Sequence, residues 1–199
     1  MAKEDQQILV VSRENLFGLD NARHFQGFRE HDRENYEALI LAGQKIMRRG
    51  STKEPIDHHL GNAERSLDYK QPIGYMLVVN PETQRVFAYQ RASDVKHYGE
   101  ERLHGKWSWG VGGHIEPEDG QENPLRESQL RELEEEIGIV GEITGTRVLG
   151  YINDDEDEVG KVHFGVLYLI EIDGLARPRD SEMAFGDMLT VSELEERVR

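Results

Sequence analysis

Cysteine is absent from the 199 residues, so disulfides, thiolate metal ligands and a cysteine nucleophile are excluded. Basic residues are scarce, because 24 Lys and Arg stand against 39 Asp and Glu and leave a formal net charge of −15. A surface this acidic repels the phosphate backbone of nucleic acids, and we expect no nucleic-acid partner. Long apolar runs are also missing: no stretch approaches the about 20 residues of a membrane span, and we expect no membrane partner.

What remains is the composition of a globular protein, with 37% hydrophobic and 32% charged residues. The first residues are polar and acidic and lack a signal-peptide pattern, so we expect a cytoplasmic protein. The pattern of residue types changes near residue 70, where a polar stretch at 51–70 gives way to apolar segments. We therefore predict an N-terminal arm over 1–70 that packs on a core domain over 71–199. Three roles of the arm stay open: a strand and helix added to the core, a lid, or the interface of a homodimer.

Hydrophobic periodicity predicts an α/β fold, in which a mixed β-sheet carries packed helices. In the arm we expect a strand at 8–11 and a helix over 35–50 whose apolar residues share one face. The core begins with a hairpin of two strands around a turn at 80–83. The predicted elements of the core are strands at 73–79, 84–91, 107–115, 147–152 and 161–172, and helices at 124–137 and 190–199.

The helix predicted after Asn123 carries the clearest chemical signal. Glu132, Glu135 and Glu136 are spaced so that their carboxylates share one helical face. A neighbouring face with Leu130, Leu133 and Ile137 is apolar and suited to packing on the sheet. Each like-charge pair costs about 0.2–0.5 kcal/mol on a bare helix, so something must offset the repulsion. A divalent cation would do so, Arg131 would help, and a solvated acidic helix face is the plain alternative.

Two segments decide between these interpretations. GGHIEPED at 112–119 precedes the helix, and RELEEEIGI at 131–139 lies within it. Together they resemble the signature of the Nudix (MutT-like) hydrolases, and the second segment matches that signature at every fixed position. The spacing from Gly113 to Arg131 is four residues longer than in the family pattern, which we interpret as an insertion within 119–123. A subgroup of phosphoesterases within the family looks similar, with a lengthened loop of this kind.

The resemblance implies a Nudix-like α/β/α sandwich and a mechanism that uses Mg²⁺ or Mn²⁺. Metal ligands would be Glu132, Glu135 and Glu136, with the carbonyl of Gly112 as a further ligand. Arg131 would tie the helix to the preceding loop through Asp119, which stands where the family has glutamate. The cation would neutralise diphosphate oxygens and lower the pKa of a bound water, and a carboxylate would accept its proton.

The identity of that general base stays open among three carboxylates. Glu132 and Glu135 are the candidates on the helix. A loop acid assists in many family members, and Glu158 is the best candidate in the acidic run 154–158 because it lies nearest the following strand. That run is otherwise interpreted as a solvated hairpin.

A phosphorylated substrate needs positive groups in this acidic protein. The loop that leads into the glycine-rich segment and the turn after it supply a local cluster, which we predict to bind substrate: Arg91, Arg102, His104, Lys106 and His114. Trp107 and Trp109 alternate along a predicted strand, so their side chains would face opposite ways. Core or edge packing is the favoured interpretation of these rings, and stacking of one of them on a base is the alternative. We interpret His163 as a strand histidine rather than a ligand.

The resemblance therefore predicts a metal-dependent hydrolase that cleaves a phosphoanhydride bond in a small phosphorylated molecule, such as a nucleoside diphosphate derivative. The alternative is a catalytically weak Nudix-like module that binds a nucleotide and regulates another process. Isopentenyl diphosphate isomerase has a related fold but relies on a catalytic cysteine, which this chain lacks. The substrate itself is not predicted, because specificity in the family lies in loops outside the motif.

Overall fold

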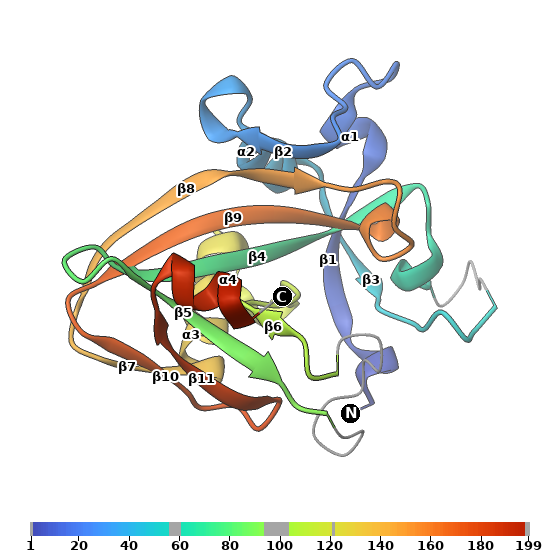
Figure 1. Cartoon of the computed structure of the whole chain (residues 1–199). Helices are drawn as coiled ribbons and strands as arrows, with labels where there is room; N and C mark the ends of the chain where they lie inside the picture. The colour runs from blue at the N-terminus through green and yellow to red at the C-terminus, as the bar shows by residue number, and fades with distance from the viewer. Residues whose placement is uncertain (1, 56–60, 94–103, 121, 198–199) are drawn as a thin grey trace. The chain divides into compact units, whose positions relative to one another are not determined.

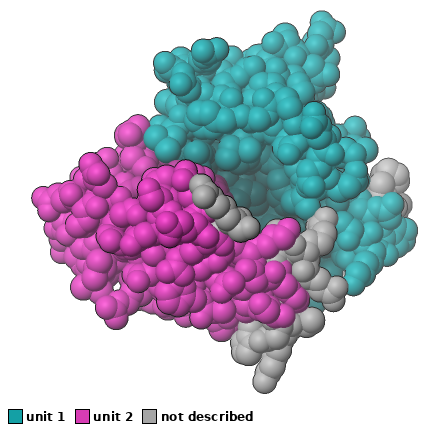
Figure 2. All heavy atoms as spheres, viewed as in Figure 1, with its two compact units in different colours: residues 1–74, 113–128, 148–167 teal, residues 75–112, 129–147, 168–199 magenta. Residues whose placement is uncertain are grey.

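A computed structural model describes residues 2–55, 61–93, 104–120 and 122–197 (Figure 1). The chain forms two compact units that are interleaved in the sequence (Figure 2). Unit 1 contains residues 1–74, 113–128 and 148–167, and unit 2 contains residues 75–112, 129–147 and 168–199. No helix of the described ranges is long and apolar enough to span a bilayer.

Unit 1 begins with elements built from the first 50 residues. These are β1 (Gln7–Ser12), α1 (Arg13–Phe17), β2 (Gly27–Glu30), α2 (Tyr36–Gly43) and β3 (Gln44–Arg48). The helix predicted over 35–50 is wrong in its second half, because Ile46 and Met47 belong to β3 and pair with β1. Ile46 and Met47 are adjacent and only two in number, and so short an apolar run is as compatible with a strand as with a helix.

Four elements contribute residues to both units. They are β4 (Tyr69–Asn80), α3 (Pro124–Glu136), β8 (Ile143–Asn153) and β9 (His163–Ile172). Unit 2 adds β5 (Arg85–Arg91), β6 (Trp107–Ser108), β7 (Ile137–Val140), β10 (Leu175–Pro178), β11 (Met183–Leu189) and α4 (Val191–Arg197). The hydrogen-bonded order of the main sheet is β11-β5-β4-β9-β8-β2, with β1 also paired to β4, and β10 and β7 form a separate ribbon.

The core of unit 1 is aromatic. Phe17, Phe25, Tyr36, Tyr151 and Phe164 are buried, and their ring centroids lie 4.9–6.4 Å apart in mostly edge-to-face contacts. Edge-to-face aromatic pairs stabilise the folded state beyond the contribution of the apolar area that they bury. The packing fixes α1, α2 and β2 beside the parts of β8 and β9 that belong to this unit.

The core of unit 2 is aliphatic. Val86, Ala88, Leu189 and Leu194 are buried together, with Val79 and Trp107 packed against them. These residues join β5, β11 and α4, and the register of β5 against β11 places Val86 opposite Leu189. The sequence analysis did not predict β10 or β11, and the strand predicted at 107–115 is shorter than expected, since β6 ends at Ser108.

Candidate active site

Helix α3 positions the predicted metal ligands. Its start is fixed by the Asn123 side chain, which accepts a hydrogen bond from the backbone N–H of Arg126 at 3.2 Å, and Pro124 occupies the first helical position. The helix ends at Glu136, and the chain continues directly into β7. Leu133 and Ile137 are buried as expected, but Leu130 is exposed, so the apolar face is narrower than predicted.

Within unit 2 the structure brings the acidic face of α3 together with one arginine. Arg131 Nη1 lies 2.7 Å from Glu132 Oε1 and 3.5 Å from Glu135 Oε2. The Glu132 side chain is only 12% exposed, whereas that of Glu135 is 61% exposed. Arg131 therefore offsets part of the repulsion between the two carboxylates, and Glu135 is the member of the set that meets solvent.

Glu136 is the unusual carboxyl of the helix. Burial, and after it the nearby charge of Glu132, raise its pKa to about 8, against the opposing effect of the positive charge of Arg91. The backbone N–H of Gly112 donates to Glu136 Oε2 at 3.2 Å. Gly112 has a φ of 141°, a conformation that side chains rarely adopt, so only glycine brings its backbone to this carboxyl without strain.

The predicted substrate residues separate into three groups. Arg91, His104 and Lys106 lie in unit 2, where the backbone of Arg91 bonds that of Lys106 and Gly105. Arg91 also lies 5.3 Å from the ring centroid of Tyr89. Arg102 lies outside the described residues. His114 belongs to unit 1, where its Nε2 lies 2.8 Å from Gln71 Oε1.

The two predicted loop acids also belong to unit 1. The Glu158 side chain is 80% exposed and forms an ion pair with Lys161. Asp119 is buried, and its Oδ2 accepts a hydrogen bond from the backbone N–H of Glu116 at 2.7 Å, which closes the short 3-10 turn Pro117–Asp119. Each of these carboxylates thus has a local role in its own loop.

Trp107 and Trp109 line one cavity of about 300 Å³ in unit 2, together with residues of α4. The alternation expected from a strand does not apply, because β6 ends between the two tryptophans. Trp107 is half-buried and Trp109 is about half exposed. Both tryptophans therefore line the same cavity.

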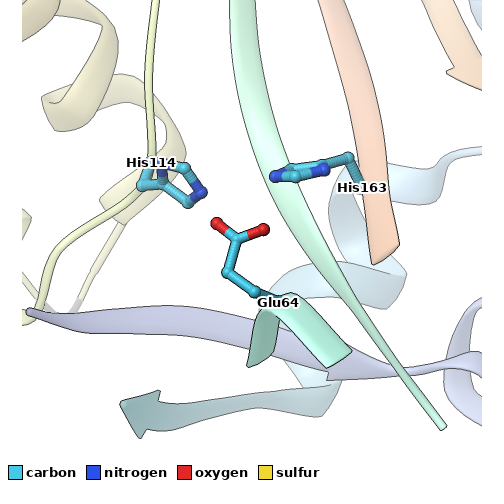
Figure 3. A group of neighbouring side chains, drawn as sticks. All are labelled: Glu64, His114 and His163. Atoms are coloured by element: carbon cyan, nitrogen blue, oxygen red, sulfur yellow. The ribbon is translucent and has the colours of Figure 1, made fainter. Parts of the chain in front are cut away.

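The sequence analysis missed one group of side chains. The potential ligand atoms of Glu64, His114 and His163 all lie within 4.8 Å of one another (Figure 3). Among the residues that the structure describes, no other group of three or more His, Asp or Glu side chains is this close. The three glutamates of α3 are not drawn together to that distance, which agrees with the pairing of Arg131 to two of them. His114 was predicted as a substrate residue, and His163 as a plain strand residue. No sequence signal marks Glu64.

Comparison with known proteins shows the family to which the chain belongs. The sequence model of the NUDIX domain matches residues 70–199, and the chain belongs to the NUDIX domain family. A curated relative, Protein YmaB of Bacillus subtilis, is 36% identical over 204 aligned residues, which cover 98% of this chain and 91% of that protein. The crystal structure of Tm1382, described as a candidate Nudix hydrolase, superposes with a TM-score of 0.70 at 23% identity and covers 96% of this chain and 90% of Tm1382. The predicted fold class, α/β with a mixed sheet of the Nudix kind, is confirmed.

Proposed function

We propose that this protein is a divalent-metal-dependent Nudix hydrolase that cleaves a phosphoanhydride bond in a small phosphorylated molecule of the nucleoside diphosphate type. Family membership supports the hydrolase class. The observation that carries the proposal is the acidic face of α3, on which a half-buried Glu136 with a raised pKa lies beside Glu132, whose side chain is 12% exposed. A helix that only met solvent would have no reason to bury two neighbouring carboxyls.

The donor types on this face suit a hard cation, although the three carboxylates would have to move closer together to bind one. Glu132, Glu135 and Glu136 supply carboxylate oxygens, and Gly112 adds a backbone carbonyl from the segment that already contacts Glu136. Mg²⁺ and Mn²⁺ both prefer oxygen ligands of this kind. A bound cation would supply charge neutralisation of the diphosphate and a water of lowered pKa. It would also favour the ionised form of Glu136, whose pKa is raised to about 8 in its absence.

The remaining residues would bind and orient the reactants. Glu135 is exposed and Glu132 lies on the same face of the helix, so one of these two would accept a proton from the attacking water. Arg91 and Lys106 place positive groups in the same unit as the carboxylates, His104 adds an imidazole that can hydrogen-bond phosphate, and Arg102 adjoins them in the sequence. Arginine suits the phosphate because its guanidinium donates two parallel hydrogen bonds.

We also infer that residues 71–199 form the hydrolase domain and residues 1–70 an arm that packs on it in the cytoplasmic protein. Within unit 1, β1 pairs with the start of β4 through Val11 and Lys70. The backbone N–H of Leu9 donates to the carbonyl of Ile115 at 2.8 Å, next to the motif histidine. These bonds support an arm that adds a strand rather than one that folds alone.

The test is product release from a panel of nucleotide sugars, dinucleoside polyphosphates, ADP-ribose, NADH and nucleoside triphosphates, each with Mg²⁺, Mn²⁺ or chelator. We expect metal-dependent turnover that Glu135→Gln lowers by about 10²-fold, the typical contribution of a positioned acid or base. Glu134→Gln is the matched control, since Glu134 is the exposed neighbour on the same helix. Equal turnover of the two variants would contradict the assignment of Glu135.

A second candidate is a non-catalytic module that binds a nucleotide. The observation that favours it is the pairing of Arg131 with Glu132 and Glu135, which offsets their repulsion without a cation. If no compound of the panel turns over while some still raise the melting temperature, this second function is the better one.

The tryptophan cavity leads to a prediction about binding. If the base of a nucleotide substrate stacks on the exposed indole, Trp109→Ala will raise KM while kcat stays within a few-fold of wild type. Loss of one base–aromatic contact is worth about 1–3 kcal/mol, or roughly tenfold or more in KM. Steady-state kinetics on the best substrate checks this, with Trp109→Phe restoring most of the affinity. A fall in kcat at unchanged KM would contradict a binding role.

A further inference from the structure

Three segments of unit 1 meet at a small polar cluster (Figure 3). Glu64 lies in the 3-10 turn Ala63–Arg65, and His163 is the first residue of β9. His114 follows the two motif glycines and forms an isolated antiparallel bridge with Ile73. The two imidazole centroids are 5.5 Å apart and their planes are inclined at 64°, and the Glu64 side chain reaches up between them. We call these three residues the Glu64 cluster.

Each imidazole already uses one nitrogen outside the cluster. His163 Nδ1 lies 2.7 Å from the carbonyl oxygen of Val159, which can only accept, so Nδ1 carries the proton and Nε2 keeps its lone pair. His114 Nε2 lies 2.8 Å from Gln71 Oε1, an arrangement in which Nδ1 keeps the lone pair. A metal-binding histidine typically donates its other N–H to an oxygen in this way, which fixes the tautomer and the ring orientation.

The charge state of the cluster suits a cation. The neutral imidazole is the form that binds metals, and the contacts to Val159 and Gln71 leave one ring nitrogen of each histidine with a lone pair. Glu64 supplies a negative charge and a side chain that is 15% exposed.

Arg49 is the group that competes with a cation. Its Nε lies 3.0 Å from Glu64 Oε1, and its charge opposes a second positive charge nearby. A carboxylate has two oxygens, however, and a ligating carboxylate is commonly hydrogen-bonded on the other one. The Arg49 contact therefore orients Glu64 without using both of its oxygens.

We propose that Glu64, His114 and His163 bind a borderline divalent cation of the Zn²⁺ type. Two imidazoles and one carboxylate are a donor set that zinc accepts, with a fourth position left for water. The nitrogen ligands separate this site from the all-oxygen face of α3, which prefers Mg²⁺ or Mn²⁺. A bound ion would tie the Ala63–Arg65 turn, the motif turn and the start of β9 together within unit 1. It would also give His114 a role other than the phosphate contact expected from sequence.

The experiment is a titration of the chelator-stripped full chain with Zn²⁺ by calorimetry in excess Mg²⁺, which occupies hard oxygen sites. Co²⁺ is then titrated in parallel, since its visible d–d absorption reports nitrogen ligation and coordination number. We expect one Zn²⁺ per chain with a Co²⁺ spectrum of low coordination number. Glu64→Gln and His163→Gln should each weaken Zn²⁺ at least about tenfold, the lower end of what even an outer-shell change costs.

Two controls make the result specific. His31→Gln changes another histidine of unit 1, one that contacts Tyr151, and Glu135→Gln changes the α3 face. Both should leave the Zn²⁺ affinity and the Co²⁺ spectrum unchanged. Far-UV circular dichroism checks that each variant is folded. Because Glu64→Gln and His163→Gln change different residues of the cluster, a misfolded variant at one position still leaves the other as a test. Absence of a tight Zn²⁺ site in wild type, or equal affinity in the cluster variants and the controls, would overturn the proposal.

Discussion

Glu136→Gln is expected to abolish metal-dependent hydrolysis while making the metal-free protein more stable. The carboxyl is buried beside Glu132, and its pKa is raised to about 8, so the ionised form is unfavourable in the folded state. A neutral amide removes that cost and still accepts the hydrogen bond from the Gly112 N–H. The same change removes a charge that the proposed cation needs. Function and stability are therefore predicted to change in opposite directions at this residue.

The pH dependence of the free energy of unfolding tests whether Glu136 destabilises the folded protein. An acid whose pKa is higher in the folded than in the unfolded state binds more protons when folded, so stability falls as the pH rises from about 4.5 to about 8. Glu136→Gln removes this slope, and at pH 8 in chelator we expect it to gain about 2–4 kcal/mol over wild type. Urea unfolding at pH 5 and pH 8 measures the difference.

The same unfolding experiments with added Mg²⁺ test whether Glu136 binds the cation. Wild type should recover stability with the cation, because a ligand that binds only the folded state stabilises it by mass action, and Glu136→Gln should respond less. Glu134→Gln, on the exposed side of the same helix, should follow wild type in turnover and in both unfolding experiments. A variant that loses activity but shows the pH slope of wild type would argue that Glu136 is ionised and solvated in the folded protein.

Local patterns predicted α3 and its acidic face because the evidence for both lies within thirteen residues. The cap at Asn123, the proline at the first position and the spacing of three glutamates need no information from elsewhere in the chain. The hairpin of β4 and β5 was predicted for the same reason. What the pattern did not show is that the pKa of Glu136 is raised, because burial depends on how the rest of the chain packs around the helix.

Residues that meet across long sequence separations were not predicted. The Glu64 cluster joins positions 64, 114 and 163, and each of them alone resembles an ordinary polar residue of a loop or strand. The acidic run 154–158 was interpreted as a solvated hairpin, which describes Glu158 but not Asp155. Periodicity cannot tell one acid of such a run from the next, because the partners that distinguish them lie more than 80 residues away.

Asp155→Asn is expected to be the most destabilising conservative change in unit 1. Asp155 Oδ1 lies 2.7 Å from Lys70 Nζ, and Oδ2 lies 2.6 Å from Arg13 Nη2 and 2.7 Å from His24 Nε2. The Lys70 side chain is 0% exposed, and its remaining hydrogen-bond partner is the carbonyl of Gly160. Removal of one partner of a buried ion pair costs about 3–5 kcal/mol, chiefly because the other charge stays buried without compensation.

The pH profile gives a second measure of the same interaction. Hydrogen bonds from Arg13, Lys70 and His24 hold the pKa of Asp155 well below its ordinary value of 3.8, against the effect of burial. A depressed pKa means that this stabilisation is complete above about pH 4 and is lost as the pH falls below it. Asp155→Asn should therefore unfold at lower urea concentration at pH 7 and lose less stability than wild type on acidification.

Asp154→Asn is the matched control for the adjacent position. Asp154 is half-buried like Asp155, but its side chain accepts hydrogen bonds only from Gln26 and from the backbone of Glu156 among the contacts described, and an amide oxygen can also accept these. Urea unfolding of the two variants at pH 7 should therefore separate the acid that pairs with the buried Lys70 from its neighbour in the loop. Equal stabilities would show that Lys70 finds sufficient compensation in the Gly160 carbonyl alone. A large loss only at Asp155 would establish that five consecutive acids contain one that the fold of unit 1 depends on.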